Sequence, residues 1–222
     1  MEKNLKKIIK GYKKFKNKYA HGNKSIMKHL SLNGQKPEIL IIACCDSRAD
    51  PALILQCDPG DLFVIRNVAN IVPPFEKDNM HHGTSAALEF GICHLKVRHL
   101  ILLGHSQCGG ISSLLNHQHT NNNDNNDNND FISNWVSIIN LPSCIGDAKF
   151  TDEDIDNCAK LALKKSYNNC LSFSWLKERV EKKELNIHLW FFDIKTGQIF
   201  TYSKEDDVYY PLDPDKKTIT FF

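Results

Sequence analysis

The stretch Glu38–Arg48 reads EILIIACCDSR and joins a short apolar run to a polar end that contains two cysteines. Its first six residues, Glu38–Ala43, are mostly aliphatic, which is typical of a buried strand. A second run of this kind, Arg98–Leu103 (RHLILL), is followed by Gly104 and then by His105–Gly110 (HSQCGG). The two runs predict two buried strands, each ending in side chains that can perform chemistry.

Further strands and helices surround these two runs. Turn signals, apolar periodicity and a capping-box pattern at Thr151 and Asp154 mark their bounds. We expect strands at 62–66, 187–192 and 199–202, and helices at 82–95, 131–140 and from 151 to about 183 with a break near 172–174. Strands that alternate with helices predict an α/β fold, in which a mostly parallel central sheet is flanked by helices.

We interpret the whole chain, 1–222, as a single domain with three peripheral segments. Residues 1–30 form a helical arm, because apolar side chains recur at three- and four-residue steps from Leu5 to Tyr19. Residues 116–130 are an Asn/Asp-rich insertion with almost no apolar side chain, which predicts a surface loop. Residues 203–222 are interpreted as a C-terminal tail.

The composition limits the classes of protein that need consideration. The chain has 222 residues, of which 41% are hydrophobic, and a net charge of +2, which suits one α/β domain with an ordinary core. No apolar run is long enough for a transmembrane helix, and the lysine-rich N-terminus lacks a secretory core. We therefore expect a cytoplasmic protein with reduced cysteines and with neither nucleic acid nor membrane as partner.

The polar ends of the two predicted strands are expected to meet. In an open α/β sheet, sites form at the carboxyl ends of the parallel strands. His105 and Cys108 have the spacing to share a metal ion, and Cys44 can supply a second thiolate. Two thiolates and one imidazole suit zinc, and three ligands with an open fourth position are typical of catalytic zinc.

Two further residues follow Cys44 at short spacing. Asp46 can reach the metal region, and Arg48 is placed to form a bidentate pair with it. While the pair holds, the carboxylate can accept a hydrogen bond from zinc-bound water. If the pair breaks, Asp46 can become the fourth ligand and close the site.

Spacing alone leaves other interpretations open. The cysteines could be packing residues, a structural zinc site or a redox pair, although adjacent Cys44 and Cys45 lack the spacer of thioredoxin-type motifs. From the spacing of these motifs, a catalytic zinc site is therefore one of several possible interpretations.

The complete pattern, Cys-x-Asp-x-Arg followed by His-x-x-Cys-Gly-Gly, resembles the signature of zinc-dependent β-class carbonic anhydrases of the plant-like subgroup. The similarity extends to Pro59–Pro74, Gly83–Phe90, Leu100–Gly110 and His188–Tyr202. The resemblance implies carbonate dehydratase activity, a lyase reaction in which zinc-bound hydroxide reversibly hydrates carbon dioxide to bicarbonate and a proton. It implies one Zn²⁺ per subunit.

The resemblance also implies roles for individual residues. Cys44, His105 and Cys108 match the zinc ligands, and Asp46 and Arg48 match the catalytic dyad. The substrate-binding positions of the family match Gln35, Phe63, Val68, Phe90 and Gly109. Phe90 stands where plant-like members often carry Tyr, so a hydroxyl is lost and the apolar wall remains. The presence of Gln35 leads us to expect an open zinc site near neutral pH.

Members of this family form homodimers or larger homo-oligomers. The resemblance implies that the N-terminal arm wraps a partner and that Gln35 and Phe63 reach the partner's zinc. Two rival functions remain: a hydrolase of another small linear substrate, such as carbon disulfide or carbonyl sulfide, and a non-enzymatic module stabilised by zinc. A saturated ligand set would indicate the module, and substrate competition would separate the two enzymes.

Overall fold

The computed structural model describes residues 2–78, 80–120, 131–141 and 150–213, with the side chains of 117–120 left aside. It contains one six-stranded sheet with the strand order β2-β1-β3-β4-β5-β6. The strands are β1 (Ile39–Cys44), β2 (Leu62–Asn67), β3 (His99–His105), β4 (Asn186–Asp193), β5 (Gln198–Ser203) and β6 (Val208–Pro211). Strands β2, β1, β3 and β4 pair in parallel, whereas β5 and β6 are antiparallel. The predicted α/β fold with a mostly parallel sheet is confirmed.

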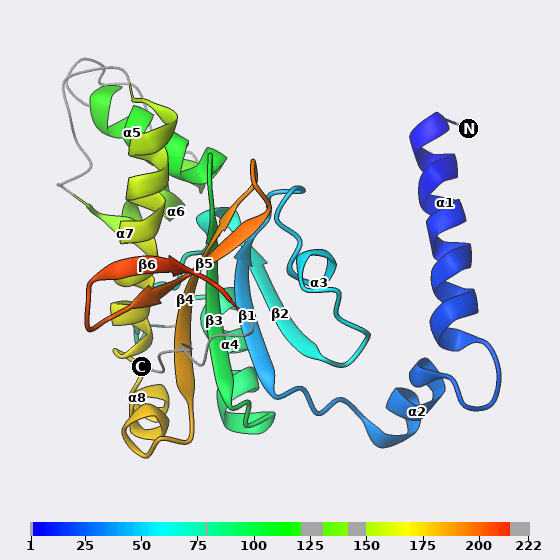
Figure 1. Cartoon of the computed structure of the whole chain (residues 1–222). Coiled ribbons are helices and arrows are strands. Elements are labelled where there is room, and N and C mark those ends of the chain that lie inside the picture. Colours follow the sequence, from blue (N-terminus) through cyan, green and yellow to red (C-terminus); the bar gives the residue numbers. More distant parts are fainter. Residues whose placement is uncertain (1, 79, 121–130, 142–149, 214–222) are drawn as a thin grey trace.

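Helices flank this sheet (Figure 1). The α-helices are α1 (Lys3–Phe15), α2 (Ile26–Asn33), α3 (Pro51–Ile54), α4 (Gly83–Glu89), α5 (Gly109–Thr120), α6 (Phe131–Val136), α7 (Asp152–Cys170) and α8 (Ser174–Glu181). Short π-helical or 3₁₀ turns are η1 (Lys16–Ala20), η2 (Val68–Asn70), η3 (Phe90–His94) and η4 (Ser137–Ile139). No described helix is long and apolar enough to cross a membrane.

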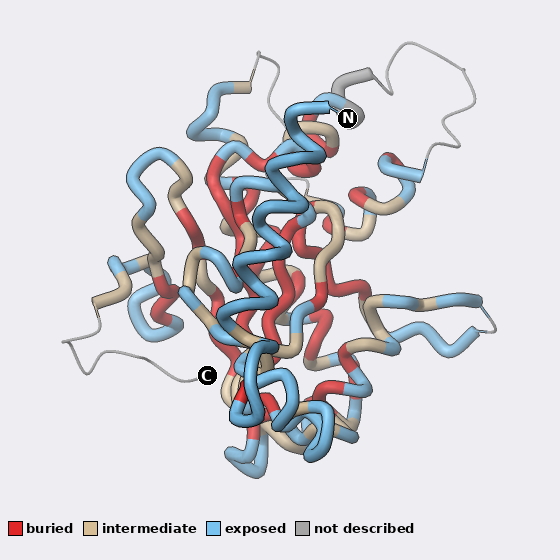
Figure 2. The backbone as a smooth tube through the Cα atoms, turned by 90° about the vertical axis from the view of Figure 1, so that its right-hand side faces the viewer, coloured by how far each residue is buried: buried red, intermediate tan, exposed pale blue. Residues whose placement is uncertain are grey.

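The central strands form because their side chains are apolar on both faces. In β1 every residue from Leu40 to Cys44 is buried, and β3 is buried from Leu100 to its end. Continuous burial of this kind is characteristic of parallel strands that are covered by helices on both sides. The burial places β1 and β3 at the centre of the core, shown as the red segments of Figure 2.

Local sequence signals set the start of several helices. The predicted capping box at α7 is present, because Thr151 accepts the N–H of Asp154 and Asp154 accepts the N–H of Thr151. Helix α3 begins with Asp50 as its N-cap and Pro51 in its first turn. The cap of α7 matters for the site, because its first two turns approach the end of β3.

Two peripheral segments differ from the sequence predictions. The tail expected at 203–222 contains the sixth strand, β6, which has only four residues (VYYP) and ends in a proline, so it gives a weak strand signal. The insertion expected at 116–130 begins inside α5, which continues to Thr120, and residues 121–130 lie outside the described part. Cys144 and residues 214–222 of the C-terminal tail also lie outside it.

The N-terminal arm is helical, as the sequence predicts, and it stands apart from the sheet (Figure 1). None of the residues of α1 is buried, and its apolar side chains are exposed, including Leu5, Ile8 and Tyr12. An isolated helix of this length has only marginal stability in water. Its apolar face therefore requires a contact that its own chain does not provide.

Two adjacent glycines at the start of α5 give a stability test. A Cβ at Gly110 would lie 2.7 Å from Val68 Cγ1 and 2.9 Å from the Cβ of Ala69, whereas a Cβ at Gly109 would meet nothing within 4 Å. We expect Gly110→Ala to reduce the free energy of unfolding by about 1–3 kcal/mol through overpacking. Gly109→Ala should be neutral or stabilising by at most about 1 kcal/mol. Urea-denaturation midpoints measure both, and equal midpoints for the two variants would contradict the close packing of α5 on η2.

Candidate metal centre

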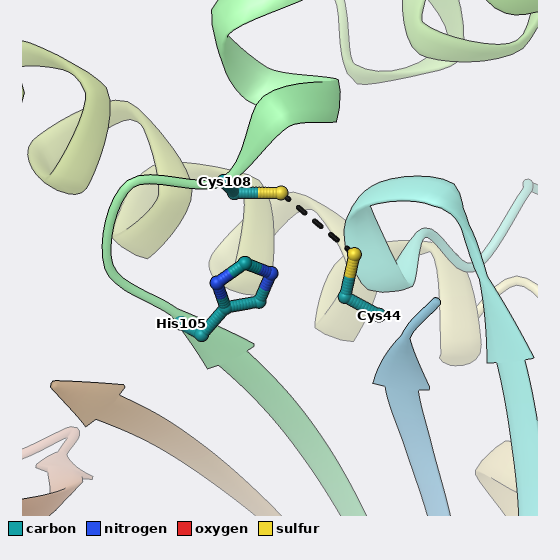
Figure 3. Close-up of side chains that lie close together, drawn as sticks. All are labelled: Cys44, His105 and Cys108. Carbon is teal, nitrogen blue, oxygen red and sulfur yellow. Dashed lines mark hydrogen bonds between the residues drawn. The ribbon is translucent and has the colours of Figure 1, made fainter. Parts of the chain in front are cut away.

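Three side chains converge at the carboxyl edge of the sheet (Figure 3). Cys44 is the last residue of β1, His105 is the last residue of β3, and Cys108 precedes α5. Their ligand atoms all lie within 4.8 Å of one another, and all three side chains are buried. The structure thus brings together the three residues that the sequence suggested as zinc ligands.

The geometry of this cluster fits a tetrahedral zinc ion. The sulfur atoms of Cys44 and Cys108 are 3.9 Å apart. Two thiolates at the usual Zn–S distance of about 2.3 Å with a tetrahedral angle would be about 3.8 Å apart. His105 Nδ1 lies 2.9 Å from the carbonyl oxygen of Ser106, which requires the proton on Nδ1. The buried Nε2 atom, which has no hydrogen-bond partner, is left to bind a metal.

The ionisation of the two thiols is coupled. The pKa of Cys44 is lowered to about 4, first by a hydrogen bond from Cys108 and also by the neighbouring His105, against the effect of burial. The Cys44 sulfur in turn raises the pKa of Cys108, as does burial. Cys44 therefore loses its proton easily, whereas Cys108 does not. A divalent cation removes this opposition, because thiols that coordinate a metal lose their protons.

Asp46 and Arg48 form the expected bidentate pair beside the cluster. Arg48 Nε lies 3.0 Å from Asp46 Oδ1, and Nη2 lies 2.8 Å from Oδ2. The backbone N–H of Arg48 also donates to Oδ1. These bonds to Arg48 hold the pKa of Asp46 well below its usual range. Asp46 is engaged by Arg48 and is not a member of the three-residue ligand group.

The loop that carries Asp46 is anchored by Arg66 of β2. Its guanidinium donates to the backbone carbonyl oxygens of Cys44 and Asp46 at 2.8 and 2.7 Å, and it forms an ion pair with Asp50. Arg66 lies beside Ala43 in the parallel register, which directs its side chain to this loop. Sequence reasoning missed Arg66, and only its place at the end of a predicted strand could have suggested it.

The turn between His105 and Cys108 is held from two sides. Ser106 is bonded to the end of β4, because its N–H donates to Phe192 and its hydroxyl accepts the N–H of Ile194. Gln107 adopts a left-handed conformation with φ of 52° and is bonded to α7. Its carbonyl oxygen accepts a hydrogen bond from Arg48. The partners of this turn come from distant parts of the chain, so sequence reasoning did not find them.

The predicted substrate-binding residues fall into two groups. Val68 and Gly109 lie at the carboxyl edge, near the metal ligands, and Val68 lines a cavity of about 620 Å³. Phe63 and Phe90 contact each other, with ring centroids 5.8 Å apart. Phe63 pairs with Leu40, four residues before Cys44 in β1, which corresponds to about 13 Å along the strand.

Gln35 belongs with the distant group. It is exposed, and it precedes β1 at the end of the strand opposite to Cys44. One chain therefore does not gather the predicted substrate pocket around its own metal ligands. The prediction that Gln35 and Phe63 reach a partner's zinc stays a prediction.

Comparisons with known proteins agree with this site. Residues 39–199 match the family model described as carbonic anhydrase. The chain is 34% identical to β carbonic anhydrase 3 of Arabidopsis thaliana over 90% of this chain and 81% of that protein. It is 35% identical to the mitochondrial β carbonic anhydrase 6 of the same plant, over 72% of this chain but only 54% of the relative.

Solved structures show the same fold. The β-carbonic anhydrase CcaA superimposes with a TM-score of 0.80 at 26% identity, covering 96% of this chain and 94% of that one. A tetrameric β-carbonic anhydrase of Sordaria macrospora gives a TM-score of 0.74 at 29% identity, covering 90% and 97%. Fold and family define a zinc α/β enzyme, and Cys44, His105 and Cys108 form its candidate metal centre. The chain belongs to the carbonic anhydrase family, and within it to the β class.

The two neighbouring cysteines of the site give a matched test of zinc ligation. Cys44 is buried in the ligand group, whereas Cys45 is exposed and outside it. We expect about one zinc per chain in the wild-type protein and in Cys45→Ser, and loss of most of the zinc in Cys44→Ser, because one of three ligands is gone. Elemental analysis after dialysis against a weak chelator measures the zinc content. Full zinc retention by Cys44→Ser would contradict the assignment.

Proposed function

We propose that this protein is a carbonate dehydratase that uses one Zn²⁺ per chain to interconvert carbon dioxide and bicarbonate. The observation that carries the proposal is a three-ligand set, with the unpartnered Nε2 of His105 facing two thiols, next to a preformed Asp46–Arg48 pair. A structural zinc module would saturate the ion with a fourth protein ligand, and the described residues of this cluster offer three.

The chemistry divides between the metal and this chain's own residues. Zinc, when bound, lowers the pKa of a coordinated water from about 16 to about 7. Asp46, kept ionised by Arg48, accepts hydrogen bonds and donates none. It therefore orients a hydroxyl or water at the site and disfavours a ligand without a proton. Burial of the cysteines and His105 excludes solvent from the ligands themselves.

Carbon dioxide is the substrate favoured by the relatives. All the relatives compared above are named as carbonic anhydrases. The apolar residues Val68, Phe63 and Phe90 suit a small linear molecule without charge, and Gln35 can orient one of its oxygens. We propose that Val68 acts on the zinc site of its own chain. Phe63, Phe90 and Gln35 act on the zinc site of the neighbouring subunit.

We further propose that the protein is a homodimer or a larger homo-oligomer whose arm packs on a partner. The apolar side of α1 is exposed in the single chain. Residues 1–24 contain nine lysines and one acidic residue, whereas the whole chain has a net charge of only +2, so the remainder is net negative. A basic arm thus complements the body of a second copy. The tetrameric state of the Sordaria macrospora relative is in line with this proposal.

The remaining proposals concern organisation and location. We interpret residues 1–222 as one domain, supported by a single sheet whose strands span from Ile39 to Pro211. We also propose a cytoplasmic location, supported by seven free cysteines among the described residues, which suits a reducing compartment. Cell fractionation tests the location, and recovery in an oxidising compartment would contradict it.

The activity is tested by stopped-flow hydration of carbon dioxide with zinc-loaded protein. We expect rapid hydration that falls by about 10²-fold or more in Asp46→Ala, because a group positioned at the reacting centre typically contributes this much. Glu205→Ala removes an exposed carboxylate in the β5–β6 turn and should retain wild-type activity. Absence of hydration at pH 7 to 9 by protein with full zinc content would contradict the proposal. Direct measurement of carbon disulfide or carbonyl sulfide hydrolysis would then identify the alternative substrate.

The arm is tested by a pair of substitutions on opposite sides of α1. Ile8→Asp places a charge on the exposed apolar side, whereas Lys10→Gln changes the lysine-rich side. We expect Ile8→Asp to reduce the molecular mass in analytical ultracentrifugation to that of a smaller species, because burying an unpaired charge is costly. Lys10→Gln should leave the mass unchanged. An unchanged mass for Ile8→Asp would show that this side is not an interface.

A further inference from the structure

Helix α7 contacts the turn that carries two of the zinc ligands. The N–H of Gln107 donates to Asp156 Oδ1 at 2.7 Å, and the side-chain amide of Gln107 donates to Asp152 Oδ2 at 2.8 Å. Gln107 lies between His105 and Cys108 in the sequence. The two carboxylates therefore act on the same residue, one on its backbone and the other on its side chain.

The peptide group that joins Ser106 to Gln107 stands between Asp156 and the zinc ligand His105. Its N–H faces Asp156, and its carbonyl oxygen accepts a hydrogen bond from His105 Nδ1 at 2.9 Å. The peptide is trans, so its N–H and C=O point in opposite directions. A carboxylate, a peptide group and an imidazole thus form one hydrogen-bonded row that ends at the metal-binding Nε2 atom.

This row has the properties of a supporting partner for a metal ligand. A hydrogen bond to an ionised carboxylate is stronger than one between neutral groups. It polarises the peptide, and linked hydrogen bonds strengthen one another in an environment of low dielectric constant. The carbonyl oxygen of Ser106 becomes a better acceptor for Nδ1–H. Partners that accept this proton fix the ring orientation of a ligating histidine and increase its basicity.

We propose that Asp156 is a positioning residue for zinc, acting on His105 through the Ser106–Gln107 peptide group. The inference rests on the proposed function, since it takes zinc as the bound ion. In many zinc sites a carboxylate contacts the ligand histidine directly. Here the peptide group separates the two, and Asp156 lies 51 positions further along the chain on another element.

The conformation of Gln107 supports this role independently. Its φ of 52° is unfavourable for a residue with a Cβ. Such a conformation persists only where the surrounding structure holds it, and residues in unfavourable backbone conformations are concentrated at functional sites. It also turns the Gln107 carbonyl oxygen to Arg48 Nη2, 3.2 Å away. The turn that Asp156 holds is therefore connected to the Asp46–Arg48 pair as well as to His105.

The same helix provides matched controls. Asp152 bonds only the side chain of Gln107, so Asp152→Asn removes the charge from this clamp on the turn, keeps an acceptor oxygen, and does not touch the peptide row. Glu153 is exposed in the same helical turn as Asp152, so Glu153→Gln removes only a charge. Asp156→Asn removes the charge but keeps the shape and an acceptor oxygen. Asp156→Ser removes the charge and is also too short to contact the N–H of Gln107.

The test measures zinc affinity of the full chain by competition with a chromogenic chelator. We expect Asp156→Asn and Asp156→Ser to bind zinc about tenfold or more weakly than the wild-type protein, as for other partners of metal ligands. Asp152→Asn and Glu153→Gln should stay within about twofold. The absorption bands of bound Co²⁺ should shift in the Asp156 variants alone, which a general loss of stability would not produce.

The outcomes separate this inference from the proposed function. A wild-type protein that binds no zinc would overturn the proposed function and the inference together. Wild-type zinc affinity and an unchanged Co²⁺ spectrum in both Asp156 variants would overturn the inference alone. The inference would also be overturned if Asp152→Asn and Glu153→Gln lost as much zinc affinity as the Asp156 variants. The loss would then come from charge or from clamping of the turn. Loss confined to Asp156 would support it.

Discussion

The parallel pairing of β1 with β3 is the constraint on which the metal centre depends. It sets Ala43 beside Leu103, so the next residues of both strands emerge at the same edge and bring Cys44 to His105. The strands are buried on both faces, which fixes their register against slippage. A shift of one residue would turn Cys44 to the opposite face of the sheet. The zinc site is therefore specified by the packing of the core before any ion binds.

A site made at a strand edge still needs its loops held in place. Arg66 of β2 fixes the backbone after Cys44, the end of β4 fixes Ser106, and α7 fixes Gln107. Each of these supports is a hydrogen bond to backbone, and each comes from a different element. Preorganisation of this kind keeps the ligands and the Asp46–Arg48 pair near one geometry, which a catalytic site requires.

The sequence predicted what depends on local pattern. Continuous apolar runs identified the central strands, and the pair Thr151 and Asp154 identified the start of α7. The spacing of His105 and Cys108 suggested a shared metal ion, and the structure brings these two side chains together with Cys44. The sequence did not predict Arg66 or Asp156, because an arginine in a strand and an aspartate in a helix are ordinary in sequence. Their roles arise from contacts that only the tertiary fold creates. Strand β6 was missed because an edge strand with an exposed side carries a weak apolar pattern.

The distribution of the remaining functional residues links chemistry to assembly. The ligands and the Asp46–Arg48 pair are complete within one chain, whereas Phe63, Phe90 and Gln35 lie towards the opposite end of the strands. The arm likewise has an apolar side that its own chain leaves exposed. A homo-oligomer would meet both requirements with one contact, since the partner that covers the arm can also bring its distant pocket residues to the metal. Under that arrangement zinc binding would be a property of the single chain and substrate binding a property of the assembly. Loss of association would then weaken catalysis while leaving the metal in place.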